Sequence, residues 1–361
     1  MRLLQPGPGR YIHGDQVLLT IGAMMAGLGL QAVTIVSGRQ SFAAAGGVVT
    51  ASLTRAQVRW GMVTYGGECT DEEVERIEAG LLPKTEAIVG MGGGKVLDLA
   101  KIVADRSFLP CVAVPTLISN CAATNPNTTV YHPDGRFCRQ HLCAVPPRMT
   151  VVDDTLLRAS PLRYFRSGLG DTLAKPYEAA LAVTDDAPWM SRLAYGLAVR
   201  GAQLIADRGA DVVARFAAPG AVEGLPDFID AVLLVGGMVG GIGGDAARTA
   251  AAHAVHNGLT EVAHAETRDS THGEKVAYGL VVQETLLGRD PATLRELRRT
   301  LGRLGLPDSW RALTHADHGF PDKLQAALAE YLVQDGIMPT MPRVSAAGLR
   351  EALMRVEATA A

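Results

Sequence analysis

The sequence has few aromatic residues, no run of basic residues and no Cys-x-x-Cys pair, and each absence excludes a class of protein. Aromatics make up 5% of the chain and the net charge is -3 at pH 7, so we expect no nucleic acid partner. The five cysteines are an odd number, which fits reduced thiols in a cytoplasm better than a disulfide framework. These absences predict a cytoplasmic protein.

Long apolar runs are missing as well. The first residues, Met-Arg-Leu-Leu-Gln-Pro-Gly-Pro-Gly, break too early for a signal peptide, and no segment reaches the ~18 uninterrupted apolar residues of a membrane span. We therefore expect no membrane partner. Hydrophobic residues make up 48% of the 361 residues, and Ala, Gly and Val are common, which is typical of an α/β enzyme. At ~100–200 residues per domain, this length predicts two domains.

Short β-branched runs alternate with helical patterns in the first part of the chain, which indicates a parallel sheet wrapped by helices. Thr70, followed by Glu73, predicts a capping box at a helix start, and Lys95–Ala104 has an amphipathic helical pattern. The turn sequence His132-Pro-Asp-Gly135 predicts a hairpin. The expected strands are Ala32–Val36, Gly47–Ser52, Glu86–Gly90, Pro110–Pro115 and Met149–Asp153.

From about Arg158 onward the strand signal nearly vanishes and long Ala/Leu-rich stretches predict a helical domain. The fold class is therefore an α/β N-terminal domain, residues 1–157, followed by an all-α C-terminal domain, residues 158–361. Paired glycines at 236–237, 240–241 and 243–244 are expected to let a helix pack closely or to end it. The expected helices are Met190–Arg208, Asp227–Val239, Ala246–Asn257, Lys275–Leu287, Thr293–Leu304, Asp322–Leu332 and Ser345–Val356.

A glycine cluster, Gly92, Gly93 and Gly94, stands between an apolar strand and a helical pattern that begins with Lys95. Such a turn places bare backbone N–H groups and the positive end of a helix dipole where a phosphate can bind. It is no Walker loop, because Val96 follows the lysine, and no Gly-x-Gly-x-x-Gly fingerprint, because Lys95 occupies the last glycine position. A tight turn without a ligand explains the cluster equally well when it is taken alone.

Two histidines three residues apart, His253 and His256, lie on one face of an expected helix, and a third, His272, precedes Gly-Glu-Lys. Together with the Gly-Asp171 motif they supply the ligand types of a catalytic divalent metal. His264 lies in a polar stretch that we assign to a surface loop.

The combination of Gly-Gly-Gly-Lys-Val-Leu-Asp, Val-Pro-Thr at 114–116 and the metal motifs resembles the glycerol dehydrogenase branch of the iron-containing alcohol dehydrogenase family, over nearly the whole chain. The resemblance implies a dinucleotide-binding domain followed by a helical domain, and homo-oligomers. It implies that the metal takes Asp171, His253 and His272, and that His256 lies near the nicotinamide, either for proton transfer or in a structural role. The residues it implies for NAD(P) binding are Gly92, Gly93, Gly94, Lys95, Asp98, Thr116, Ser119 and Tyr131.

The first departure from the family concerns the cofactor. Many NAD-using members have an Asp after the first strand, whereas this strand ends Val36-Ser37-Gly38-Arg39. Without the carboxylate a 2′-phosphate is not repelled, and Arg39 could pair with it, with Ser37 nearby. The alternative is that Arg39 is a solvated residue that opens the next helix. Both NAD(H) and NADP(H) stay open.

The second departure is Lys175, which stands where iron-type members carry a further His ligand. A protonated lysine cannot ligate a cation, so three protein ligands are expected, which favours Zn²⁺; Fe²⁺ also accepts two His and one carboxylate. Lys175 could hold a substrate carboxylate, or instead pair with Asp171 or Glu178. Because Pro176 follows, we expect helical geometry to be disfavoured at Lys175.

A third departure is Cys121, which stands where glycerol-using relatives have an Asp. Its loss removes an acceptor for a polyol hydroxyl and a repeller of anions. With Gly-Asp-Thr-Leu-Ala-Lys and Gly-Gly-Met-Val-Gly-Gly, this change resembles the 2-hydroxycarboxylate dehydrogenase subgroup. The expected function is a metal-dependent NAD(P)(H) oxidoreductase that interconverts a small 2-oxo acid and a 2-hydroxy acid. The alternatives are a glycerol or other alcohol dehydrogenase, and a sugar-phosphate cyclase of the dehydroquinate synthase type.

Overall fold

The structure, a computed structural model, describes residues 3–244, 247, 249–334 and 344–359. Two compact units make up the chain, Met1–Pro161 and Leu162–Ala361. The sequence placed the division a few residues earlier, between residues 157 and 158. In the structure the short helix α5 (Asp154–Arg158) follows strand β8 directly and is capped by the Asp153 side chain, so it continues the first unit.

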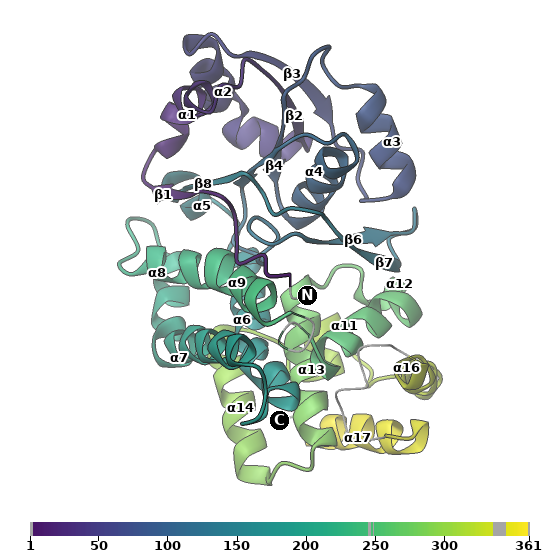
Figure 1. Ribbon diagram of the computed structural model, residues 1–361. Coiled ribbons are helices and arrows are strands. Elements are labelled where there is room, and N and C mark those ends of the chain that lie inside the picture. The colour runs from purple at the N-terminus through teal and green to yellow at the C-terminus, as the bar shows by residue number, and fades with distance from the viewer. Residues whose placement is uncertain (1–2, 245–246, 248, 335–343, 360–361) are drawn as a thin grey trace. The chain divides into compact units, whose positions relative to one another are not determined.

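The first unit is built on a six-stranded sheet in the order β1-β8-β5-β4-β2-β3, in which every neighbouring pair is parallel (Figure 1). A separate two-stranded antiparallel hairpin pairs β6 with β7. The strands are β1 Tyr11–Gly14, β2 Ala32–Ser37, β3 Arg59–Thr64, β4 Ala87–Gly92, β5 Cys111–Pro115, β6 Asn127–Tyr131, β7 Phe137–Leu142 and β8 Met149–Asp153.

Helices cover both faces of this sheet, and alternate strand residues divide between two cores. Val33, Ile35 and Val89 pack with the side chains of α1 and α2, whereas Val36 and Ile88 pack with those of α3 and α4. Burial on both faces explains the nearly continuous apolar runs in the central strands. The predicted fold class is confirmed. The helices of this unit besides α5 are the 3-10 turn Val17–Thr20, α1 Ile21–Gly27, α2 Arg39–Arg55, α3 Asp71–Ala79 and α4 Gly94–Arg106.

One strand prediction was wrong and two strands were missed. Gly47–Ser52 lies inside α2, where Ala45, Val49 and Leu53 are buried at helical spacing. The β-branched pair at 48–49 gave a strand signal that tertiary packing overrode. The missed strands, β1 and β3, are the two edges of the sheet and are only half buried, so they lack an apolar run.

The local turn chemistry was predicted well. Thr70 caps α3 by accepting from the Glu73 N–H, although the Glu73 carboxylate binds the Gly66 N–H and Arg76 rather than closing a reciprocal box. The hairpin turn at residues 132–135 is also confirmed, with Gly135 at a φ of 86°. Only glycine adopts that backbone region without strain.

The second unit is helical throughout its described part (Figure 1). The expected helix Ala246–Asn257 begins outside the described residues, and the structure has α11 from Ala251. The helices are α6 Leu162–Ala182, α7 Trp189–Ala217, α8 Leu225–Asp230, a π-helical turn Ala231–Val235, α9 Gly236–Gly243, α11 Ala251–Val262, α12 His264–Thr267, α13 His272–Leu286, α14 Pro291–Leu304, α15 Trp310–Thr314, α16 Asp322–Gln334 and α17 Ala346–Ala358.

Among the described residues, one helical stretch is long and apolar enough to cross a membrane by length and composition, Leu225–Gly243. It is 56% buried inside the structure, as a core helix is. Its paired glycines act as the sequence predicted. A Cβ on Gly243 would lie 2.9 Å from the Cβ of Ala194 on α7, and the helix ends at Gly244, whose φ is 66°.

Close packing of α6, α11 and α13 depends on two glycines of α13. A Cβ on Gly273 would lie 1.8 Å from the Ser167 carbonyl oxygen on α6, and one on Gly279 would lie 2.4 Å from the Ala252 carbonyl oxygen on α11. Both distances are far inside van der Waals contact. Helix α13 can approach α6 and α11 this closely only because neither position carries a side chain.

Substituting Gly279→Ala should lower the free energy of unfolding by about 3 kcal/mol, because the methyl group must displace the α11 backbone. Gly302→Ala is the matched control, since Gly302 is an exposed glycine in α14 with nothing within 4 Å of the added Cβ. This change should raise stability by about 0.5 kcal/mol. Thermal unfolding of the two variants measures the difference, and equal melting temperatures would contradict the packing argument.

Candidate functional site

Three helices of the second unit bring one carboxylate and two imidazoles together. Asp171 lies in the middle of α6, His253 in α11, and His272 is the first residue of α13. One potential ligand atom from each lies within 4.8 Å of the other two. His253 Nε2 is 3.2 Å and His272 Nε2 is 3.5 Å from the same oxygen, Asp171 Oδ1. The structure therefore assembles the three residues that the sequence motifs singled out as metal ligands.

His272 is positioned by the start of its helix. Thr271 caps α13 with a reciprocal capping box, in which the Glu274 carboxylate accepts from the Thr271 N–H at 2.6 Å. The Gly273 N–H donates to Ser167 Oγ at 2.9 Å, which ties this helix start to α6. The Thr-His-Gly-Glu sequence thus combines a helix cap, a close approach and a potential metal ligand in four residues.

Lys175 is helical, contrary to the expectation drawn from Pro176. Both residues lie inside α6, which continues to Ala182. Pro removes one backbone hydrogen bond, and the packing of α6 against α7, α11 and α13 outweighs that loss. Lys175 Nζ lies 3.4 Å from Asp171 Oδ1, one helical turn away, and both side chains are buried. Of the two roles open to Lys175, the structure shows the ion pair with Asp171.

Glu178, one turn further along α6, fixes His253. Its Oε1 accepts from the backbone N–H groups of Ala250 and His253, at 2.7 and 3.0 Å. Its Oε2 lies 2.6 Å from His253 Nδ1. A carboxylate only accepts, so His253 Nδ1 carries a proton and Nε2 faces Asp171. A carboxylate that holds the far nitrogen of an imidazole is the usual support of a metal-ligating histidine.

A second hydrogen-bond chain fixes His272. His256 Nδ1 lies 3.0 Å from Asn257 Oδ1, and His256 Nε2 lies 3.1 Å from His272 Nδ1. The amide oxygen accepts from His256, whose neutral ring then accepts from His272 Nδ1–H. Burial lowers the pKa of His256 well below its usual range, and the neighbouring His272, Lys275 and His253 lower it further. The chain leaves the Nε2 lone pair of His272 directed toward Asp171.

The charges around Asp171 are strongly coupled. Burial alone raises the pKa of Asp171, but the Lys175 ammonium and the adjoining His253 and His272 rings hold it well below its usual range. Burial alone lowers the pKa of His253, but Glu178 and Asp171 raise it to about 9. The buried carboxylate is therefore ionised and attracts positive charge.

This arrangement fits a divalent cation. Ligands at 2.0–2.1 Å in a tetrahedral site are separated by ~3.3 Å, close to the observed 3.2 and 3.5 Å between the imidazole nitrogens and Asp171 Oδ1. Carboxylate and imidazole are ligands for both zinc and ferrous iron. Lys175 supplies no further ligand, so three protein groups can hold the ion and leave a position open.

The glycine cluster forms a strand-to-helix turn in the first unit. Gly92 ends β4, Gly93 is the N-cap of α4 without a side-chain hydrogen bond, and Gly94 begins the helix. Each would collide with a neighbour if it carried a Cβ: Gly92 with Val96 at 2.7 Å, Gly93 with Leu117 Cδ1 at 2.8 Å. The turn thus needs Gly92 for packing, because the Cβ of Val96 cannot move aside, and it also presents uncapped N–H groups suited to an anion.

The segment after β5 lies against this turn. Thr116 N–H donates to the Gly92 carbonyl at 3.0 Å, and a Cβ on Gly94 would lie 2.9 Å from Asn120 Nδ2. Thr116 therefore lies beside the turn, and Ser119 belongs to the same segment. Cys121 follows, is buried, and its Sγ accepts from Asn125 Nδ2 at 3.0 Å.

Asp98 and Tyr131 connect α4 with the β6–β7 hairpin. Asp98 Oδ2 accepts from the Thr129 N–H at 3.1 Å and Oδ1 lies 3.0 Å from Lys101 Nζ, so Asp98 joins α4 to the hairpin. Lys95 pairs with Glu68, and its ammonium lies 4.8 Å from the centre of the Tyr131 ring. These two contacts fix the side chain of Lys95, the second residue of α4.

Ser37 and Arg39 lie at the end of β2, beside the glycine turn. β2 neighbours β4, and Ser37 Oγ donates to the Met91 carbonyl at 2.8 Å. Arg39 is the first residue of α2 and is exposed. Its guanidinium is available to an anion at this edge of the sheet. His264 was misplaced by the sequence analysis: it begins the short helix α12 and is partly buried, rather than lying in a surface loop.

Comparison with known proteins agrees with this arrangement. The family model for iron-containing alcohol dehydrogenase matches residues 8–154. The chain is 36% identical to hydroxycarboxylate dehydrogenase A of Escherichia coli K12 over 249 residues, 68% of this chain and 67% of that one. It is 31% identical to a glycerol dehydrogenase of Pseudomonas putida over 325 residues, 88% of this chain and 87% of that one. The chain belongs to the iron-containing alcohol dehydrogenase family.

Solved structures share the fold of this oxidoreductase. A probable glycerol dehydrogenase from Sinorhizobium meliloti superimposes with a TM-score of 0.87 at 26% identity, over 99% of this chain and 98% of that one. Glycerol dehydrogenase from Schizosaccharomyces pombe gives a TM-score of 0.90 at 22% identity, over 99% and 91% of the two chains. The family assignment identifies the protein as an enzyme and favours the oxidoreductase expectation over the cyclase alternative.

Two positioning residues of this oxidoreductase were missed by the sequence analysis. Glu178 was considered only as an ion-pair partner of Lys175, and Asn257 was not considered at all. The spacing of Asp171, Lys175 and Glu178 places all three on one face of a helix, which was the available signal. Asn257 adjoins a candidate histidine, but sequence alone does not show which ring nitrogen its amide reaches.

Replacing Glu178 by Gln should weaken zinc binding by about 10–100-fold, because the amide supports His253 less well than a carboxylate does. Metal titration of the metal-stripped variant measures the change. Glu357→Gln is the matched control: Glu357 is a partly buried carboxylate that also accepts from a backbone N–H, that of Trp310. Zinc affinity that falls equally in both variants would argue against a specific role for Glu178.

The raised pKa of His253 predicts two opposite pH dependences. In the metal-free protein the folded state holds a proton on His253 that the unfolded state loses above its ordinary pKa of ~6.5. That stabilisation is fully present below pH ~6.5 and is lost as the pH rises through about 9. Metal affinity should rise over the same interval, because the metal competes with this proton.

Thermal unfolding of the chelated protein from pH 6.5 to 9, with zinc titrations at the same values, tests both trends. The melting temperature should fall while the affinity increases. Glu178→Gln should flatten both curves, since it removes the main charge that raises the pKa of His253. Curves that run in the same direction would contradict the assignment of His253.

Proposed function

We propose that this enzyme is a metal-dependent NAD(P)(H) oxidoreductase that interconverts a small 2-oxo acid and the corresponding 2-hydroxy acid. The observation that carries the proposal is the buried ammonium of Lys175 beside the Asp171, His253 and His272 cluster. The 36% identity to hydroxycarboxylate dehydrogenase A supports the same substrate class. We propose those three residues as the ligands of a divalent metal, with zinc favoured and iron as the alternative.

The electrostatics of the cluster suit an anionic substrate. With neutral imidazoles, Lys175, Asp171 and Glu178 together carry a net charge of minus one, which a divalent ion changes to plus one. A bound divalent ion polarises a carbonyl oxygen and stabilises negative charge on it. Lys175 then favours the substrate carboxylate and orients the neighbouring carbonyl toward the open position.

Hydrogen bonds fix which ring nitrogens of His253 and His256 carry hydrogen. Both ring nitrogens of His256 are already engaged, with Asn257 and with His272. We therefore propose that His256 positions His272 and that water delivers the proton in the oxoacid reduction. Glu178 keeps His253 in the matching tautomer.

The turn at Gly92–Gly94 is proposed to bind the pyrophosphate of the dinucleotide, with Lys95, Thr116, Ser119 and Tyr131 around it. When bound, the nicotinamide cofactor supplies or accepts the hydride. The exposed Arg39 at the end of β2 favours NADP(H), because its guanidinium can pair with a 2′-phosphate. Asp98 is kept as a proposed cofactor-binding residue. A cytoplasmic location and a homo-oligomer are proposed from the sequence and the family resemblance.

A glycerol or other polyol dehydrogenase is the second candidate. Relatives named glycerol dehydrogenase from Pseudomonas putida and Thermotoga maritima are each 31% identical to this chain. Cys121 favours the oxoacid over the polyol. Its buried thiol carries no charge, so it neither accepts strongly from a polyol hydroxyl nor repels an anionic substrate.

The deciding experiment compares 2-oxobutyrate and 2-oxoglutarate reduction with glycerol oxidation, using NADH and NADPH or their oxidised forms, before and after chelation. Reduction of an oxoacid that is lost on chelation and restored by zinc is the expected result. Lys175→Met should raise the KM for the oxoacid by about 10–100-fold, because a charged hydrogen bond of ~1.5–3 kcal/mol is lost. Neutral aldehydes, as internal controls, should be reduced at nearly unchanged KM.

Two further variants separate the parts of this proposal. Asp171→Ala should remove both zinc at this site and activity, whereas Arg39→Ala should reduce the preference for NADPH over NADH and leave the oxoacid KM unchanged. Robust glycerol turnover without oxoacid reduction would replace the proposed substrate class by the polyol. An unchanged rate and zinc content in Asp171→Ala would refute the metal site.

A further inference from the structure

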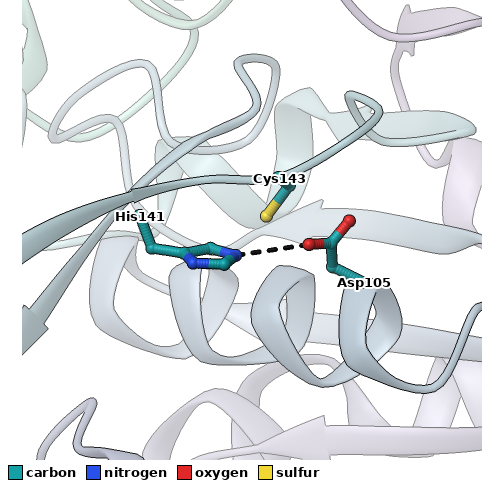
Figure 2. A group of neighbouring side chains, drawn as sticks. All are labelled: Asp105, His141 and Cys143. Atoms are coloured by element: carbon teal, nitrogen blue, oxygen red, sulfur yellow. Dashed lines mark hydrogen bonds and ion pairs between the residues drawn. The ribbon is translucent and has the colours of Figure 1, made fainter.

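A second group of metal-ligating side chains lies in the first unit, outside every residue used above. Asp105 is near the C-terminal end of α4, His141 is in β7, and Cys143 follows that strand. Figure 2 shows the carboxylate, the imidazole and the thiol pointing toward one another. One potential ligand atom from each lies within 4.8 Å of the other two, and in the described part of the chain only the Asp171 group shares this property.

The side chains are held in place by contacts around them. Asp105 Oδ1 accepts from the Ala144 N–H at 2.8 Å, which turns Oδ2 toward His141 Nε2 at 3.3 Å. Cys143 is 2% exposed, and its own N–H donates to the Pro126 carbonyl at 3.0 Å. The side chains of His141 and Asp105 are 29% and 19% exposed, so ions can reach the cluster from solvent.

The separation of the imidazole nitrogen and the carboxylate oxygen matches a metal site as closely as the corresponding distances in the first group do. A tetrahedral site with bonds of 2.0–2.1 Å separates nitrogen and oxygen ligands by ~3.3 Å, and the His141 to Asp105 distance is 3.3 Å. The corresponding distances at Asp171 are 3.2 and 3.5 Å. The C-terminal end of α4 adds the negative end of a helix dipole, which favours a cation.

The ligand types decide which cation fits. An ion pair between His141 and Asp105 would need no cysteine, yet a buried sulfur completes the group. Magnesium and calcium prefer oxygen ligands only, whereas a thiolate, an imidazole and a carboxylate together suit zinc. We propose that Asp105, His141 and Cys143 bind a second zinc ion, through one carboxylate oxygen, the imidazole Nε2 and the thiolate, with one position open to water.

Binding would release the thiol proton of Cys143 to solvent, since the thiolate is the ligand. The ion would connect the β6–β7 hairpin to the end of α4, whose beginning is the glycine turn. Lys101, one turn before Asp105, does not oppose it as an isolated charge, because its ammonium lies 3.0 Å from Asp98. The site would therefore stabilise the hairpin that carries Tyr131.

Cobalt substitution distinguishes the two sites, because only the second has a sulfur ligand. The metal-stripped full-length protein is titrated with Co²⁺ and its near-ultraviolet spectrum is recorded. We expect two Co²⁺ per chain and a sulfur-to-cobalt charge-transfer band from one of them. The band should vanish in Cys143→Ala and persist in Cys138→Ala, the matched control on the same hairpin.

Two more variants keep the test independent of folding. His141→Ala changes a partly exposed side chain and should weaken the band-forming site at least about tenfold, since even outer contacts of a metal site cost 10–100-fold. Asp171→Ala should remove one Co²⁺ and leave the band unchanged. No band at two equivalents of Co²⁺, a band that survives Cys143→Ala, or unchanged affinity in His141→Ala would overturn the proposal.

Discussion

The burial of one carboxylate, Asp171, organises the helical unit. An ionised carboxylate in a protein interior costs several kcal/mol unless partners surround it. Here the partners come from three helices: Lys175 from α6, His253 from α11 and His272 from α13. The glycines of α13 allow these helices to approach closely enough for the charges to meet. The fold and the site therefore impose the same geometric requirement.

Parallel strands place the other candidate residues together. β2, β4 and β5 are neighbours in the sheet, and their carboxyl ends carry Ser37 with Arg39, the glycine turn, and Thr116. Ligands of open parallel sheets bind at this edge. Strand order thus brings together residues that are far apart in the sequence, and the Ser37 to Met91 hydrogen bond adds a side-chain contact at the same edge.

The sequence predicted best where one residue type has few alternatives. The glycine turn and the turn at residues 132–135 form where the sequence predicted them, and the Asp171, His253 and His272 side chains lie close to one another within the second unit. The sequence predicted secondary structure less well where tertiary packing determines it. The β-branched residues inside α2 indicated a strand, and Pro176 indicated a break at Lys175, because local propensities carry no information about the neighbouring helices.

Supporting residues were harder to find than ligands. Glu178 acts through the far nitrogen of His253, so its identity as a partner depends on how α6 and α11 are rotated about their axes, whereas Asn257 acts through its neighbour His256 on the same helix. Sequence spacing gives the face of each helix but not the rotation that brings two faces together. The sequence did not predict the Asp105, His141 and Cys143 cluster either, because spacing along the chain does not show which hairpin residues lie against the end of a helix.

The chain from Asn257 through His256 to His272 has a directional property. The amide oxygen determines which nitrogen of His256 bears hydrogen, and that choice sets the polarity of the next ring. Rotating the amide by half a turn would present its NH₂ instead, reverse both rings, and leave a hydrogen on His272 Nε2, where a cation needs a lone pair. The orientation of one neutral amide, two residues removed from the carboxylate cluster, thus sets which nitrogen of His272 is free of hydrogen.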